Sequence, residues 1–77
     1  KFSCFKTKNM SFRVEGKLEN SSDVKIELIS LDGKCGTIYH NVSRGKFEFS
    51  FEVKEKGLYF LRITLNNKNF EVHKILA

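Results

Sequence analysis

The 77-residue sequence contains no proline and no tryptophan, only two cysteines, and no long apolar run. A membrane-spanning helix needs roughly 18 to 20 apolar residues in succession, so we expect no membrane span in this chain. The sequence also contains no Cys-x-x-Cys pair and no glycine-rich phosphate loop, which excludes the usual zinc and nucleotide motifs. We expect residues 1–77 to form one small domain, with residues 1–9 as a tail or an edge strand.

What the sequence does contain is the two-residue period of β-strands. Phe47, Phe49 and Phe51 alternate with polar residues, as in a strand that buries one face. After a polar turn that ends at Gly57, residues 58–65 are apolar on both faces, which indicates a strand with neighbours on each side. We expect this hairpin to form the centre of the core, with its phenylalanine side facing the interior.

Turn signals divide the rest of the chain into similar segments. The turns are expected at residues 19–23, 32–33, 43–45 and 66–69, where Asp, Asn, Ser and Gly are concentrated. The strands are expected at residues 1–8, 10–18, 24–31, 35–42, 46–53, 58–65 and 70–76. Gly16 interrupts one of them and predicts a bulge or a close backbone approach. About seven short strands without a helix predict an all-β fold, a small sandwich or barrel.

Two features favour an extracytoplasmic location. Asn9, Asn20 and Asn41 each begin an Asn-x-Ser triplet, and the absence of proline leaves every middle residue permitted for N-glycosylation. A disulfide between Cys4 and Cys35 would add roughly 3 to 4 kcal/mol by restricting the unfolded chain, and two free thiols are the alternative. The three triplets favour the disulfide over two free thiols, and they favour a secreted, luminal or cell-surface glycoprotein.

The charge of the chain is mildly basic, with a net value of +5. A net positive charge favours binding to a nucleic acid or to an anionic membrane, but a charge of this size is also common among soluble domains. Residues 44–51 are similar to the aromatic strand of RNA-recognition sheets. However, Glu48 and Glu52 would place negative charge on the other face, and the core needs the rings. Nucleic acid is therefore a disfavoured partner.

Catalytic and metal chemistry have no positive support in the sequence. His40 and His73 are far apart, and neither stands at a metal-ligand spacing. Cys35 lies five residues before His40, which places the two on opposite faces of a regular strand, and no carboxylate is spaced to orient the histidine. Glu48 and Glu52 share a face at roughly 13 Å, beyond the separation of glycosidase carboxylates. We expect no enzyme, no cofactor and no metal site.

Three segments resemble known sandwich modules. They are residues 23–34, which end in Asp-Gly-Lys, residues 45–49, Gly-Lys-Phe-Glu-Phe, and residues 56–63, Lys-Gly-Leu-Tyr-Phe-Leu-Arg-Ile. Their order is similar to that in prealbumin-like and immunoglobulin-like domains, including the carboxypeptidase-regulatory-like domains of the endoplasmic reticulum lumen. Residues 56–77 also resemble the C-terminal sorting domains of the bacterial type IX secretion system. The resemblance implies a single small antiparallel β-sandwich of about seven strands that docks or addresses the protein carrying it.

The sequence therefore predicts a non-catalytic, extracytoplasmic β-sandwich module whose partner is another protein. Its expected docking surface is an exposed strand edge near the basic front segment. The candidate contact residues are Arg13, Lys17, Arg44 and Lys46. The alternatives are a sorting domain for type IX secretion and a β-domain that binds single-stranded nucleic acid.

Overall fold

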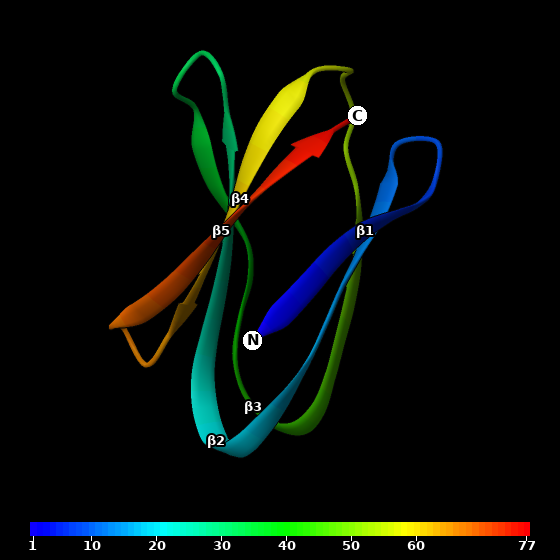
Figure 1. Ribbon diagram of the computed structural model, residues 1–77. Helices are drawn as coiled ribbons and strands as arrows, with labels where there is room; N and C mark the ends of the chain where they lie inside the picture. The colour runs from blue at the N-terminus through cyan, green and yellow to red at the C-terminus, as the bar shows by residue number, and fades with distance from the viewer.

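The computed structural model describes the backbone of residues 1–77 and every side chain except those of residues 69 and 70. Its strands are β1 (Phe2–Lys8), β2 (Ser11–Ser30), β3 (Cys35–Glu52), β4 (Leu58–Leu65) and β5 (Asn69–Leu76). All pairings are antiparallel, and the five strands form one sheet that curls around an interior (Figure 1). The described backbone contains no helix, and so none that could span a membrane. The predicted all-β class is confirmed.

The predicted count of seven strands is wrong, because two pairs of expected strands are continuous. β2 runs through residues 19–23 and β3 runs through residues 43–45, which we expected to be turns. At the bend, three residues of β2 (19–21) stand opposite a single residue of β3, Arg44. The next residue of β3, Gly45, has a φ of 76°. This bulge bends both strands together, so their pairing resumes beyond it. The sandwich class, immunoglobulin-like or prealbumin-like, stays a prediction.

The shared bend divides the curled sheet into two halves. In the first half, β1 and residues 45–52 of β3 flank residues 11–18 of β2. In the second half, residues 35–43 of β3 and all of β4 flank residues 22–30 of β2, and β5 follows β4. Figure 1 shows the halves joined at the bends and splayed at the other end, where the β2–β3 hairpin loop and the loop before β4 lie.

The core lies between the two halves and takes side chains from both. Its main buried cluster consists of Phe2, Val14, Leu18, Val24, Ile26, Phe47, Leu61 and Ile63. Phe47 is 4% exposed, and its ring stands nearly perpendicular to those of Phe2 and Tyr39, with centroids 5.7 and 5.2 Å away. Phe49 and Phe51 are half-buried on the same face and stack on each other at 6.0 Å. The phenylalanine side of this strand therefore faces the interior, as predicted.

The outer strands β1 and β5 approach each other and complete the curl. The Phe2 N–H donates to both carboxylate oxygens of Glu71 on β5, at 3.2 Å each. The Phe2 ring then lies over its register partner Gly16 on β2, where a Cβ would stand 2.6 Å from the nearest ring carbon. The pairing on both sides of Gly16 is regular. Of the two expectations for this glycine, close approach is therefore correct and a bulge is not.

Two of the predicted turns close hairpins. Gly33 has a φ of 90° in the Asp32-Gly33 turn between β2 and β3. Asn66 and Asn67 have φ values of 53° and 60° between β4 and β5, a region that asparagine adopts at little cost. The closing strand that we predicted is β5, and the side chain of its Phe70 lies outside the described residues.

Replacing Gly16 with alanine is expected to lower the free energy of unfolding by about 1 to 3 kcal/mol, because the added methyl group must displace the buried Phe2 ring. Urea unfolding followed by circular dichroism measures this change. Gly36→Ala is the matched control, since a Cβ at Gly36 meets no atom within 4 Å. We expect the control to be neutral or slightly stabilising. An equal loss in both variants would contradict the close approach.

Candidate binding surface

The second edge of β3 is the longest unpaired strand edge in the described sheet. Among the described strands β3 pairs with β2 alone, and no other strand runs alongside it; β1 meets β3 only across the core, where Phe2 packs on Phe47. β3 is 18 residues long, whereas β1 and β5 have 7 and 8 residues. An edge of this kind presents backbone N–H and C=O groups that can pair with a strand from another chain.

Charge divides this edge into two parts. The C-terminal part carries Arg44, Lys46, Glu48 and Glu52, and natural proteins place charges on edge strands to prevent unwanted pairing. Residues 35–43 carry no lysine, arginine, aspartate or glutamate. Val42, in this part, has 65% of its surface exposed. We call residues 35–43 of β3 the uncharged edge.

Side chains of the uncharged edge bond to one another. The Val42 N–H donates to the side-chain oxygen of Asn41 at 2.8 Å. The register partner of Val42, Asp23, directs both its N–H and its C=O to Asn66 in the β4–β5 turn, so Asp23 and Val42 form a non-hydrogen-bonded pair. The Val42 N–H therefore lies on the side of β3 that faces away from β2. The hydroxyl groups of Tyr39 and Ser43 are 2.8 Å apart and share another hydrogen bond. These bonds order the segment without a second strand beside it.

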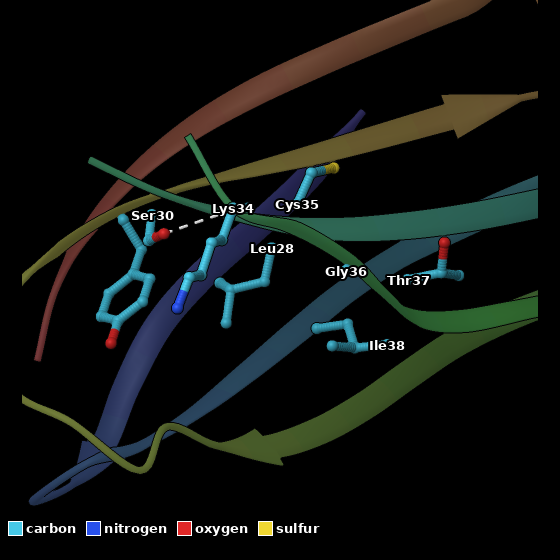
Figure 2. A pocket seen from close by; sticks show the side chains of 8 residues that line it. Leu28, Ser30, Lys34, Cys35, Gly36, Thr37 and Ile38 are labelled. Atoms are coloured by element: carbon cyan, nitrogen blue, oxygen red, sulfur yellow. Dashed lines mark hydrogen bonds between the residues drawn. The ribbon is translucent and has the colours of Figure 1, made fainter. Parts of the chain in front are cut away.

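A cavity of about 340 Å³ opens beside the start of the uncharged edge (Figure 2). Its walls are Leu28, Ser30, Lys34, Cys35, Gly36, Thr37, Ile38 and Tyr59. A second cavity of about 380 Å³ shares Leu28, Ser30, Lys34 and Tyr59 with the first and extends to residues 52–55. Together they form a groove at the splayed end of the sheet, which we call the end groove.

Hydrogen bonds fix the two loops that border the end groove. On one side, the Lys34 N–H donates to the Asp32 carboxylate at 3.2 Å, and the Ser30 hydroxyl donates to the same group. These donors lower the pKa of Asp32. On the other side, the Tyr59 hydroxyl donates to the carbonyl of Glu55 at 2.7 Å. The groove walls are therefore held in place before any ligand arrives.

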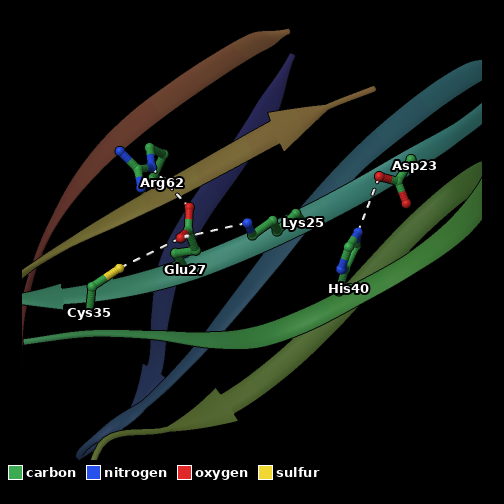
Figure 3. A network of polar contacts seen from close by, with 6 residues as sticks. All are labelled: Asp23, Lys25, Glu27, Cys35, His40 and Arg62. Carbon is green, nitrogen blue, oxygen red and sulfur yellow. Dashed lines mark hydrogen bonds and ion pairs between the residues drawn. The ribbon is translucent and has the colours of Figure 1, made fainter. Parts of the chain in front are cut away.

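A polar network covers the outer face of the second half (Figure 3). Glu27 accepts a hydrogen bond from Arg62 Nε at 2.9 Å, and the Lys25 ammonium group is 3.9 Å away. The hydrogen bond from Arg62 lowers the pKa of Glu27. The Cys35 thiol donates to the same carboxylate at 3.6 Å. The described contacts of this network thus centre on the Glu27 carboxylate, which Arg62, Lys25 and the Cys35 thiol all approach.

Cys35 and His40 share the outer face, which corrects the expectation that they lie on opposite faces. The register of β2 with β3 shifts beside Ile38, and this extra residue changes the parity between the two positions. Asp23 bonds to His40 Nε2 at 3.1 Å, which corrects the expectation that no carboxylate could orient this histidine. The Cys35 thiol bonds to Glu27 and not to His40. Among the described residues, no group of three or more His, Cys, Asp or Glu is placed to hold a metal ion.

The predicted disulfide between Cys4 and Cys35 is wrong for this structure, in which both cysteines are free. Cys4 lies opposite the buried Val14 and packs against the core, where burial raises the pKa of its thiol. Cys35 points to the outer face, toward Glu27 (Figure 3). The two sulfur atoms thus belong to opposite faces of the sheet, a relation that sequence spacing does not determine.

The four basic residues predicted to bind a partner do not form one patch. Lys17 and Lys46 are register partners, and Arg13 lies farther along the same outer face of β2. Arg13 and Lys46 are each paired with a glutamate two residues further on. Arg44 stands apart at the bend. The sequence did not predict the uncharged edge, because the only sequence feature that marks it is a run of residues without charge.

The three asparagines of the predicted glycosylation triplets are all exposed. Asn9 lies in the turn between β1 and β2, Asn20 in the bend of β2, and Asn41 on the uncharged edge. Asn41 is thus the one whose modification would change the candidate binding surface.

Comparison of the chain with protein-family models, with curated proteins and with solved structures finds no match in any of the three. The resemblance to prealbumin-like, immunoglobulin-like and sorting modules therefore remains a prediction. Any function assigned to the chain depends on the surfaces described above.

Replacing Glu27 with glutamine is expected to lower the Tm at neutral pH. Arg62 holds the folded-state pKa of Glu27 below its unfolded value, so this stabilisation is present above the unfolded pKa and is lost as the pH falls through the folded pKa. The Tm difference between wild type and variant should therefore shrink on acidification below the usual carboxyl range. Scanning fluorimetry across that range measures it, with the exposed Glu48→Gln as control. A difference that stays constant with pH would refute this role.

Proposed function

We propose that this chain is a non-catalytic module that binds an extended segment of another protein along the uncharged edge. The observation that carries the proposal is an open strand edge whose residues 35–43 lack the protective charges present farther along the same strand. A bound segment would lengthen the sheet through main-chain hydrogen bonds. Its alternate side chains would lie on the two faces of the sheet.

The end groove supports this proposal because it begins where the uncharged edge begins. Residues 35–38 belong to the edge and also line the groove. A strand paired there would place a side chain close to the apolar surface of Leu28 and Ile38. In recognition by strand addition, main-chain bonds supply affinity and such pockets supply specificity.

We prefer a protein partner to single-stranded nucleic acid. A base needs an exposed ring to stack on. Phe47 is buried, and Phe49 and Phe51 are half-buried against the core, which leaves little of the aromatic row for stacking. For the sorting alternative, no surface described here gives specific support.

We also infer that the module works outside the cytoplasm. The exposed Asn9, Asn20 and Asn41 support this location, since each is accessible in an Asn-x-Ser triplet. The free thiols of Cys4 and Cys35 remove the support that a disulfide would have given. The two facing halves of the curled sheet favour an immunoglobulin-like or prealbumin-like class within the same proposal.

Replacing Val42 with proline is expected to weaken peptide binding about tenfold, because it removes an open-edge N–H that a bound strand would take over from the Asn41 side chain. The probe is a fluorescein-labelled nine-residue peptide of alternating threonine and valine, followed by fluorescence polarisation. Val42→Ala keeps the N–H and should bind within about twofold of wild type. Circular dichroism checks that both variants fold. Absence of binding to wild type, or equal binding by Val42→Pro, would overturn the proposal.

Expression through a eukaryotic secretory pathway is expected to add glycans at the three triplets, which intact mass before and after glycosidase treatment detects. A glycan on Asn41 lies on the uncharged edge, so the glycosylated protein should bind the peptide more weakly than Asn41→Gln. Asn9→Gln, in the turn between β1 and β2 and away from that edge, should leave binding unchanged. A secreted chain without glycans would contradict the proposed location.

A further inference from the structure

We infer that the segment bound by the uncharged edge is acidic at both of its ends. This inference rests on the proposed function, because it names the chemistry of the partner at the same site. It comes from the distribution of charge around residues 35–43 of β3.

Positive charge flanks the uncharged edge on both sides. Lys34 precedes it and Arg44 follows it, and both residues are exposed. In the part of the chain whose side chains are described, neither has an acidic partner within 4 Å. The charge of Asp32 interacts with Lys34 from a longer distance, and the Asp32 carboxylate is already bonded to the Ser30 hydroxyl and the Lys34 N–H. Neither cation is therefore directly paired with an acid, and both can form an ion pair with a ligand.

The nearby acids of β2 are already engaged. Asp23 lies 3.1 Å from His40, and Glu27 lies 2.9 Å from Arg62. Neither carboxylate is therefore free to neutralise the flanking cations. An incoming strand meets a neutral backbone edge with a cation at each end.

The symmetry of these charges makes the preference independent of strand direction. Lys34 and Arg44 are ten positions apart, which corresponds to roughly 33 Å along an extended strand. A partner strand of similar length with a carboxylate near each end reaches both cations whether it pairs parallel or antiparallel. Opposite charges facing each other across paired strands stabilise the pair.

A second copy of this chain fits the same edge poorly. Antiparallel pairing of two copies about Tyr39 would place Lys34 of one copy opposite Arg44 of the other, at both ends of the interface. Like charges directly opposite each other are destabilising. The flanking cations therefore select a foreign acidic strand and oppose self-association of the open edge.

The test uses three labelled peptides with the same alternating threonine–valine centre and with glutamate, serine or lysine at both ends. Fluorescence polarisation gives their Kd values for the whole chain at low salt. We expect the glutamate-flanked peptide to bind about tenfold more tightly than the lysine-flanked one, because two exposed ion pairs are exchanged for two repulsions. Added salt should reduce this ratio, since it screens exposed charges.

Charge reversal provides the second arm of the test. The double variant Lys34→Glu/Arg44→Glu should reverse the order of the glutamate-flanked and lysine-flanked peptides. The matched control is Lys68→Glu/Lys74→Glu, which changes the net charge equally at exposed positions in the β4–β5 turn and on β5. The control should keep the wild-type order.

The outcomes separate this inference from the proposed function. Equal affinity for all three peptides, still weakened by Val42→Pro, overturns the acidic partner and leaves edge binding intact. No binding of any peptide overturns the proposed function itself. Dimerisation of the unliganded chain in sedimentation velocity, lost in Val42→Pro, identifies a second copy as the occupant and also overturns the inference.

Discussion

The bend that β2 and β3 share is the constraint on which the rest of the structure depends. Because the two strands are paired on both sides of it, one hairpin contributes two strands to each half of the sheet. The bend turns the inner faces of those halves toward each other, and Phe47 packs between Phe2 and Tyr39 in the enclosed space. A straight hairpin of the same length would be a ribbon without a core, and such ribbons are marginally stable in water.

Use of the aromatic face as core leaves the strand edges as the available binding surface. β1 and β5 meet at their edges, where the Phe2 N–H bonds to Glu71, but β3 has no comparable neighbour in the described sheet. Charged side chains protect the half of β3 that follows the bend, and residues 35–43 lack them. The uncharged edge therefore combines open backbone groups with apolar side chains at its groove end and with one cation on each flank, Lys34 at the groove and Arg44 at the bend.

Alternation along the sequence was sufficient to place the strand segments and the buried face of the Phe47 strand, because successive side chains of a strand point to opposite sides. It assigned Cys35 and His40 to the wrong relative faces, because the extra residue beside Ile38 changes the parity there. It did not distinguish a turn from a bulge at residues 19–23, since both need polar, flexible residues. The difference depends on whether residues 43–45 bend with them, which is a non-local property. The predicted disulfide was wrong for a similar reason, because the faces on which Cys4 and Cys35 lie are determined only by the folded sheet. The absence of charge at residues 35–43 indicates a binding surface only once β3 is known to be an edge strand.

Amide hydrogen exchange, measured by NMR on dilute protein, tests most directly whether the uncharged edge is open. We expect alternating protection along residues 35–43, with slow exchange for amides bonded to β2 and fast exchange for those on the open side. The amides of Ile26 and Ile63, within the buried core, should exchange slowly. Uniformly slow exchange through residues 35–43 in the monomeric protein would mean that the edge is already covered, and would contradict the binding surface assigned here.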